Sequence, residues 1–324
     1  MTTEEYFKNL ASKLELIQKE RERISRKHNF LREKLREKLP VEDDFLTGSY
    51  IRDTMIRPKG EDKFDVDFFL AFNKDDYGET ELPDLLKIVK HALDEIKDND
   101  KDIVEINDQQ KRSIGVIYND NFQIDAVPAI QIEKDKRYKI FDKRTQKAII
   151  SNPKLHSQSL TTANEATESG SVKRLVPIVK LLKSWRREKC DYMKSFHLEM
   201  LTVEILKDQE IKAFSEGIAK FFTNAQDHLK TASLIDPANK DNVIDEYLDD
   251  DGTRDDIIEL ISVEKNIVER AIKFEQEGED ESAVKEWQKI FEGENGEDKN
   301  FSDSPIRTGP VVIKRPPAQP WCDV

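Results

Sequence analysis

Apolar residues recur at helical spacing through the first 39 residues of the chain. They stand at Phe7, Leu10, Leu14, Ile17, Ile24, Leu31, Leu35 and Leu39. Intervals of three, four and seven place them on one face of a helix, and no Gly or Pro interrupts residues 3–39. The pattern predicts one long helix, or two in line, that Pro40 ends.

The pattern changes to that of a sheet with interspersed helix after residue 40. The predicted elements are a Thr-Gly-Ser turn at 47–49, strands at 64–72, 114–118 and 122–130, and a helix at 82–96. Strands mixed with a helix in this order indicate an α+β lobe with a mixed sheet. We place this lobe at residues 41–165.

A helical pattern returns beyond the polar stretch that contains Asn152, Pro153 and Asn164. The predicted helices are 172–189, 196–207 and 211–229, followed by a loop at 235–242 and further helices to about Phe291. This segment predicts a helical lobe at 166–300 and a flexible, Pro-rich tail at 301–324. The predicted fold class is therefore α+β and bilobal, with a mixed-sheet lobe and a helical lobe linked by the long helix at 1–40.

Composition narrows the possible partners. The 324 residues include 66 Asp and Glu against 53 Lys and Arg, which gives a formal charge of -13. This charge disfavours binding of nucleic acid over the whole surface of the protein. The two cysteines, Cys190 and Cys322, provide neither a disulfide framework nor a Cys-rich zinc site. The N-terminus has no apolar leader pattern, and no run of about 18 apolar residues occurs, so we expect a cytoplasmic protein without a membrane contact.

Three aspartates interrupt apolar strands, where a charge has no structural benefit. Period-two alternation places Asp65 and Asp67 on one face of the strand at 64–70, and Asp125 repeats the arrangement on the strand at 122–128. If the strands are neighbours, three carboxylates meet, and hard divalent cations would offset their repulsion. The alternative is a chance pair in an acidic chain, as we judge Asp98 and Asp100 to be.

A Gly-Ser turn precedes the paired aspartates by 16 residues. Gly48 lets the backbone approach a ligand, and Ser49 opens a short helix whose free N–H groups suit phosphate. By itself such a pair is more often a plain turn. The order of Gly48-Ser49, Asp65-x-Asp67 and a later Asp125 resembles the nucleotidyltransferase superfamily of poly(A) polymerases, CCA-adding enzymes, oligoadenylate synthetases and cGAS, and it is most similar to the bacterial cGAS/DncV-like nucleotidyltransferases, or CD-NTases.

The resemblance continues into the helical lobe. Residues 178–185 resemble the family's triphosphate-binding helix, which implies phosphate binding by Lys180 and above all Lys183. Residues 194–199 resemble the following Ser motif, so Ser195 would help to hold the donor triphosphate. The alternatives are a solvated basic helix face and an N-cap role for Ser195. We interpret His197 as a structural histidine.

The resemblance implies an enzyme of antiphage defence that condenses ATP, and other nucleoside triphosphates, into a cyclic or linear oligonucleotide second messenger with release of pyrophosphate. Its implied cofactors are two Mg²⁺ ions, with Mn²⁺ as a substitute, held by Asp65, Asp67 and Asp125. Gly48, Ser49, Lys180, Lys183 and Ser195 are the implied nucleotide-binding residues. Base identity, linkage and ring size depend on pocket shape, which one sequence does not supply.

Three alternatives stay open. An enzyme that adds nucleotides to RNA needs an extended basic surface, which the acidic total disfavours. A nucleic-acid activator could bind the basic residues at 19–38, but the interspersed glutamates favour a solvated helix. A catalytically inactive nucleotide-binding module is disfavoured because all three carboxylates are present. The tail at 301–324 is predicted to be a partner-binding or conjugation segment.

Overall fold

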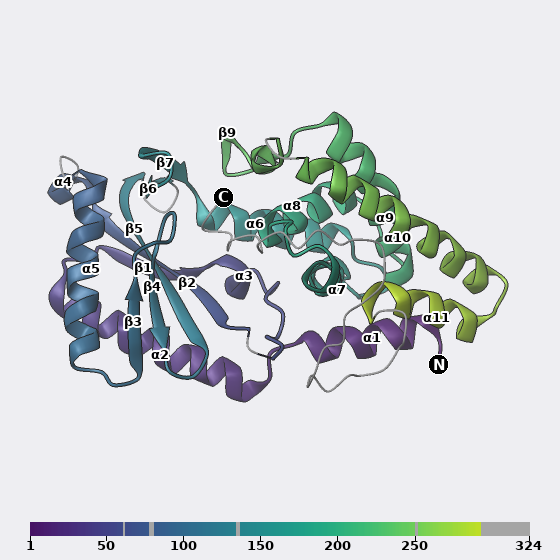
Figure 1. Ribbon diagram of the computed structural model, residues 1–324, viewed down its shortest axis with the longest axis horizontal. Coiled ribbons are helices and arrows are strands. Elements are labelled where there is room, and N and C mark those ends of the chain that lie inside the picture. Colours follow the sequence, from purple (N-terminus) through teal and green to yellow (C-terminus); the bar gives the residue numbers. More distant parts are fainter. Residues whose placement is uncertain (61, 78–80, 134–136, 250–251, 293–324) are drawn as a thin grey trace. The chain divides into compact units, whose positions relative to one another are not determined.

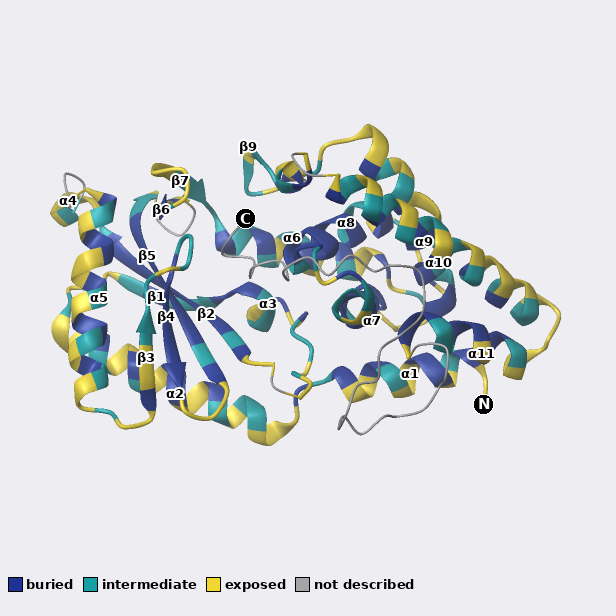
Figure 2. Cartoon of the chain, in the orientation of Figure 1, coloured by how far each residue is buried: buried dark blue, intermediate teal, exposed yellow. Residues whose placement is uncertain are grey.

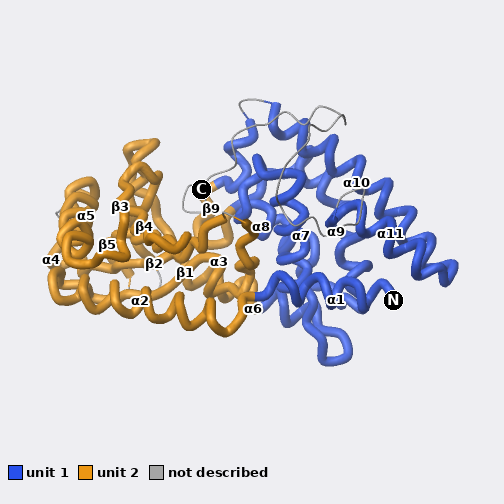
Figure 3. The backbone as a smooth tube through the Cα atoms, turned by 60° about the horizontal axis from the view of Figure 1, so that its bottom comes forward, with its two compact units in different colours: residues 1–15, 162–235, 243–320 blue, residues 16–161, 236–242, 321–324 orange. Residues whose placement is uncertain are grey.

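A computed structural model describes residues 1–292 except 61, 78–80, 134–136 and 250–251. The chain forms two compact units (Figures 1 and 3). Unit 1 holds residues 1–15, 162–235 and the described part of 243–320, and unit 2 holds residues 16–161 and 236–242. The α+β class with a mixed sheet is confirmed. The tail at 301–324 lies outside the described residues.

Unit 2 is built on a seven-stranded mixed sheet, counted over the described residues, in the order β1-β2-β5-β4-β3, with β6 paired to β5 and β7 to β6. Among these described strands, only β2 and β5 pair in parallel. The strands are β1 (Asp43–Thr47), β2 (Phe64–Asn73), β3 (Ile103–Asn107), β4 (Ile114–Tyr118), β5 (Phe122–Glu133), β6 (Arg137–Asp142) and β7 (Lys147–Ser151). The helices of this unit include α2 (Gln18–Lys38), α3 (Gly48–Ile51), α4 (Lys74–Tyr77) and α5 (Leu82–Asp98). The sequence predicted β2, β4, β5 and α5 and missed β1, β3, β6 and β7.

The two faces of the sheet differ in what covers them. Alternate residues of β2, such as Val66 and Phe68, pack against apolar residues of α2 and α5 in one core. The opposite alternation carries Asp65 and Asp67 and then joins a second, smaller core through Phe69. The buried and exposed bands of these elements are visible in Figure 2. Burial of one face thus fixes the register and leaves the other face for the carboxylates.

Basic residues of α2 are held by acidic residues of the same unit. Asp44, with its side chain 1% exposed, pairs with Arg32 and Arg36. Asp120 pairs in the same way with Arg23 at 3.0 Å and Lys27 at 3.0 Å. These four cations therefore anchor α2 to the sheet, while the Arg32 and Arg36 side chains stay 44% and 41% exposed, in keeping with the solvated face expected from the sequence.

Unit 1 is helical, as predicted. It contains α1 (Thr3–Leu14), α7 (Leu175–Lys189), α8 (Ser195–Leu206), α9 (Phe214–Thr231), α10 (Thr253–Gln276) and α11 (Asp280–Phe291), and the short η1 (Glu246–Leu248). Aromatic contacts tie the N-terminal helix to α11, since the Phe7 ring lies 5.1 Å from Trp287 and 5.8 Å from Phe291 between centroids. None of the helices in the described ranges is long and apolar enough to span a bilayer.

The predicted N-terminal helix is two helices. Glu15, with φ -72° and ψ 143°, ends α1 in extended backbone. A new helix starts at Gln18, and the Glu20 carboxylate accepts the Ile17 N–H at 2.9 Å as part of a capping arrangement. The apolar period continues across this break, so periodicity alone did not reveal it.

A segment described from the sequence only as a polar stretch, and another expected to be a loop, both have regular structure. Residues 153–166 form helix α6 (Pro153–Ala166), which starts with Pro at its first position while the Asn152 side chain accepts the Leu155 N–H at 3.1 Å. Residues 235–243 form a hairpin of β8 (Ile235–Asp236) and β9 (Asn239–Val243). The Asp236 carboxylate accepts the Ala238 N–H at 2.8 Å, which stabilises the turn of this hairpin.

Candidate functional site

The register of the sheet places two of the predicted aspartates in one row with a residue from each of the two flanking strands. Thr47 on β1 is opposite Asp67 on β2, Asp67 is opposite Asp125 on β5, and Asp125 is opposite Gly115 on β4. Residues in register on neighbouring strands project from the same face. Asp67 and Asp125 therefore face the same side of the sheet.

Asp65 belongs to the same face. It lies two residues before Asp67 on β2 and is opposite Gln123, which lies two residues before Asp125 on β5. Asp67 is 2% exposed and Asp125 is fully buried, whereas Asp65 is half-buried. The parallel pairing of β2 and β5 thus brings together three carboxylates that are up to 60 positions apart in sequence.

Asp125 accepts hydrogen bonds from two neutral amides. Gln110 Nε2 lies 2.9 Å from each of its carboxylate oxygens, and Gln123 Nε2 lies 2.7 Å from Oδ1. Gln123 follows from the period of the strand, because it shares a face with Asp125. Gln110 comes from the β3–β4 loop, and nothing in the sequence indicated its position.

Hard oxygen donors on one face are the ligand set that Mg²⁺ prefers, so the residues present fit such a cation. In the described part of the chain, no group of three or more His, Cys, Asp and Glu side chains has its ligand atoms already gathered around one point. The shared face and the oxygen donors still favour a cation site here, and the two amides direct the Asp125 oxygens in this structure.

The Gly-Ser turn lies directly after β1. Gly48 has φ +70°, a left-handed conformation that Gly adopts with little strain, and Ser49 is the second residue of α3. Since Thr47 is in register with Asp67, the turn follows the row of carboxylate positions at the end of β1. Gly48 and Ser49 thus lie in the same unit as the three aspartates and next to Asp67 in the sheet.

The predicted phosphate-binding lysines lie on α7 of unit 1. Lys180 is 1% exposed, with Nζ 2.6 Å from Glu15, and Lys183 is 4% exposed, with Nζ 2.7 Å from Glu199 of α8. Both lysines are buried and ion-paired, so the alternative of a solvated basic face is wrong at these two positions. Glu199 lies within the motif at 194–199, yet nothing in the sequence indicated its partner.

Ser195 and His197 lie in the first turn of α8. Ser195 is the first helical residue and Lys194 occupies the N-cap, so the alternative of an N-cap role for Ser195 is wrong. His197 is 1% exposed, and burial lowers its pKa to about 4, so the imidazole is neutral near pH 7. Its Nδ1 lies 3.0 Å from the Tyr247 hydroxyl, which accepts the Lys194 N–H at 2.8 Å.

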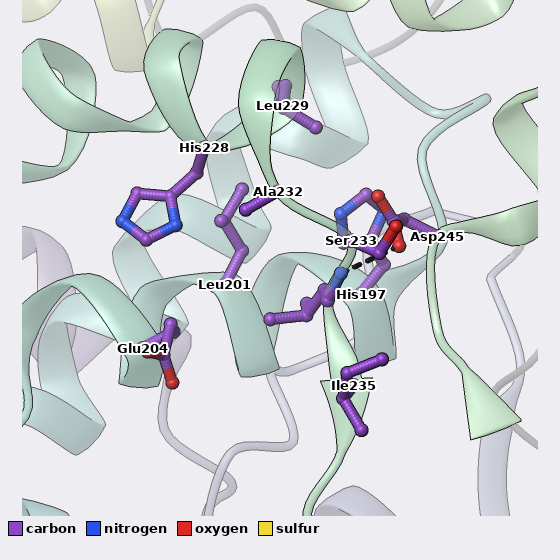
Figure 4. Close-up of a pocket in the computed structure, with 10 residues that line it drawn as sticks. His197, Leu201, Glu204, His228, Leu229, Ala232, Ser233, Ile235 and Asp245 are labelled. Carbon is purple, nitrogen blue, oxygen red and sulfur yellow. Dashed lines mark hydrogen bonds between the residues drawn. The ribbon is translucent and has the colours of Figure 1, made fainter. Parts of the chain in front are cut away.

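A pocket of about 210 Å³ lies wholly within unit 1, between α8, the end of α9 and the segment that follows α9. Figure 4 shows His197, Leu201 and Asp245 among its lining residues. The Asp245 carboxylate accepts the Leu234 N–H at 2.9 Å and pairs with Arg254 at 2.9 Å, which orders the wall of the pocket. None of the eight residues predicted to bind metal or nucleotide lines this pocket.

Comparison with known proteins identifies the family of the chain. Residues 1–164 match the family described as Second Messenger Oligonucleotide or Dinucleotide Synthetase domain. A cyclic AMP-AMP-AMP synthase of Acinetobacter sp. is 29% identical over an alignment of 216 residues that covers 63% of this chain and 59% of the relative. The chain thus spans about three fifths of the length of that curated relative.

Solved structures share the fold over most of the chain. CdnC of E. coli MS115-1, in a complex with HORMA-deltaN, matches with a TM-score of 0.68 at 19% identity, over 91% of this chain and 98% of that one. The CD-NTase CdnG of Bradyrhizobium diazoefficiens, in complex with GTP, matches with a TM-score of 0.67 at 13% identity, over 90% and 94%. Because half of the sequence matches the family model, the chain belongs to the Second Messenger Oligonucleotide or Dinucleotide Synthetase family, and it shares its fold with the CD-NTase CdnG.

Proposed function

We propose that this protein condenses nucleoside triphosphates into a cyclic or linear oligonucleotide second messenger and releases pyrophosphate. The observation that carries the proposal is the register of β2 and β5, which places Asp67 opposite Asp125 on the face that also holds Asp65. Membership of the family supports the reaction class, and similarity to the cyclic AMP-AMP-AMP synthase of Acinetobacter sp. supports ATP as a substrate.

Asp65, Asp67 and Asp125 would hold two Mg²⁺ ions, with Mn²⁺ as a substitute. When bound, such ions activate an attacking hydroxyl and neutralise charge on the leaving pyrophosphate. The rigid sheet positions the carboxylates before substrate arrives, because β2 and β5 pair continuously from Phe64 to Asn73. Asp125, buried and hydrogen-bonded by amides, is the candidate to accept the proton of the attacking ribose hydroxyl.

Gly48 and Ser49 are proposed to contact the donor phosphates, since a left-handed Gly that opens a short helix leaves backbone N–H groups for an anion. Lys180, Lys183 and Ser195 keep the phosphate-binding role implied by the resemblance. For the two lysines this role requires that the triphosphate compete with Glu15 and Glu199, or share the lysine with them. The neutral, buried His197 keeps the structural role.

The direct test is incubation of the purified protein with Mg²⁺ and each triphosphate, alone and in mixtures, with product identification by mass spectrometry. We expect pyrophosphate release and an oligonucleotide product that includes adenosine. Asp67→Asn should lower the rate by about 1,000-fold or more, equivalent to about 4 kcal/mol of transition-state stabilisation. Asp98→Asn is the matched control, because Asp98 is an exposed carboxylate at the end of α5 and should leave the rate unchanged.

Product topology separates the proposal from an enzyme that extends RNA. A product that phosphatase leaves unchanged has no terminal phosphate and is therefore a closed ring. Elongation of an added RNA primer would instead indicate primer extension. Absence of pyrophosphate from the wild type under every base mixture would reject the enzymatic proposal and leave a nucleotide-binding module.

A role in antiphage signalling, a cytoplasmic location and a protein partner are proposed from the family alone. CdnC of E. coli MS115-1 forms a complex with HORMA-deltaN, and a related regulator is a candidate partner here. Comparing product formation with and without residues 301–324, in the presence of a candidate partner, tests whether the tail takes part.

A further inference from the structure

The third carboxylate of the site is held by an amide from a different part of the sheet. Gln110, in the loop between β3 and β4, donates from Nε2 to both oxygens of Asp125 at 2.9 Å. Gln123 adds a donor to Oδ1 at 2.7 Å. Because both donors are uncharged, they orient the carboxylate without supplying a cation that would compete with a metal ion.

Ser113 fixes which way the Gln110 amide points. The Ser113 hydroxyl is fully buried and donates to Gln110 Oε1 at 2.7 Å. An amide whose oxygen accepts from Ser113 must present its nitrogen elsewhere, and here the nitrogen faces Asp125. The orientation of the Gln110 side chain is therefore specified by a hydrogen bond at each end.

Gly115 leaves the space that the Gln110 amide fills. It is the register partner of Asp125 on β4, so its missing side chain would lie on the same face. A Cβ at this position would approach Gln110 Oε1 to 3.3 Å and Cδ and Nε2 to 3.4 Å. The 3.3 Å contact with Oε1 would move the amide by a few tenths of an ångström, and glycine at position 115 avoids this shift.

We propose that Gln110 is a positioning residue for Asp125, oriented by Ser113 and accommodated by Gly115, and that it sets the affinity of the carboxylate site for divalent cations. The inference rests on the proposed function, since it assigns a role within the same site. Residues that hydrogen-bond a metal ligand fix its orientation, and their removal typically weakens metal binding or activity by about 10–100-fold.

The test measures metal binding as well as activity. Mn²⁺ binding to the full-length protein is followed by electron paramagnetic resonance in the presence of a non-hydrolysable ATP analogue. Gln110→Ala should weaken Mn²⁺ binding by about 10-fold or more and raise the Mg²⁺ concentration for half-maximal rate by a similar factor. High Mg²⁺ should restore much of kcat, which a general loss of folded protein would not allow.

Gln109→Ala is the matched control, because Gln109 is the exposed neighbouring residue and its amide contacts Asp108 instead of Asp125. It should match the wild type in both measurements. Ser113→Ala and Gly115→Ala both keep Gln110 in the chain. Ser113→Ala removes the hydrogen bond that orients the Gln110 amide, and Gly115→Ala adds a Cβ close to that amide. Both should shift the metal dependence in the same direction as Gln110→Ala, by a smaller factor.

The outcomes separate this inference from the proposed function. Suppose that the wild type is active and that Gln110→Ala and Gln109→Ala both bind Mn²⁺ as tightly as the wild type. This result would overturn the positioning role of Gln110 and leave the proposed function intact. A wild type that neither binds Mn²⁺ with the nucleotide analogue nor releases pyrophosphate would instead reject the proposed function. If Gln110→Ala does not fold, Ser113→Ala carries the comparison, and unchanged metal dependence in that variant also overturns the inference.

Discussion

Lys183 and Glu199 form an ion pair inside the helical unit. Nζ of Lys183 on α7 lies 2.7 Å from a carboxylate oxygen of Glu199 on α8, and the two side chains are 5% and 0% exposed. Removing one partner of a buried pair leaves a charge without its compensation. The pair therefore links helix packing to the lysine that the resemblance assigns to phosphate binding.

Lys183→Ala should destabilise the protein by about 3–5 kcal/mol, because Glu199 would stay buried without this cation. Chemical denaturation of the metal-free protein measures the change. The double variant Lys183→Met/Glu199→Gln removes both charges and should regain most of the stability. If Lys183 also binds phosphate, this stable double variant will still bind ATP more weakly than the wild type, whereas equal affinities would contradict that role.

Metal binding should appear in the stability of the wild type. Three carboxylates on one face repel each other, and a bound cation offsets that repulsion. Because Mg²⁺ would bind the folded state, its presence at about 100 times its Kd should stabilise that state by about 2.7 kcal/mol. Asp67→Asn removes one of the three carboxylates, so we expect its melting temperature to rise less with Mg²⁺ than that of the wild type. Thermal unfolding with and without Mg²⁺ checks both statements, and an equal Mg²⁺ response in Asp67→Asn would contradict the assignment.

Two buried histidines should make the fold sensitive to acid. Burial lowers the pKa of both His28 and His197 to about 4. Between the ordinary value near 6.5 and 4, the unfolded chain binds protons at these residues that the folded chain does not. Their contribution to stability is therefore complete above pH 6.5 and is lost as the pH falls through this window, by about 3 kcal/mol for each histidine.

His28→Gln tests the acid sensitivity, since it removes one titrating group. The His28 ring packs edge-on against the Phe68 ring, with 4.8 Å between the ring centroids. The free energy of unfolding of this variant, measured by denaturant titration between pH 7 and pH 4.5, should fall less steeply than that of the wild type. His91→Gln, at an exposed residue of α5, is the control and should keep the wild-type slope. Parallel slopes for all three proteins would show that His28 is not the cause.

Double-stranded nucleic acid should leave the rate of product formation unchanged. Four basic residues of α2 are already paired with Asp44 and Asp120, so they offer little charge to a phosphate backbone. The measurement compares the rate with and without short duplex DNA or RNA at low salt. A several-fold activation that disappears at high salt would show that this surface does bind nucleic acid.

Local sequence patterns predicted the elements whose signal lies within a few residues. The α+β class, the helix α5, the strands β2, β4 and β5 and the helices of unit 1 all follow from apolar periods of 2 or 3.6. The choice between one helix and two at residues 3–39 stayed open and the helix α6 was missed, because the helix starts are marked by capping residues rather than by periodicity. Glu20 and the Asn152-Pro153 pair are the signals that would have shown them.

The sequence alone determined that Asp65 and Asp67 share a face, because the side-chain period of a strand is two. That Asp125 lies beside Asp67 was decided by the tertiary structure, through the parallel pairing of β2 with β5. The tertiary structure also decided the hydrogen bond from Gln110 to Asp125 and the ion pair between Lys183 and Glu199. These contacts join residues that are 15 and 16 positions apart and belong to different elements. Strand period is a property of the local backbone, whereas pairing and burial depend on which distant segments exclude water together.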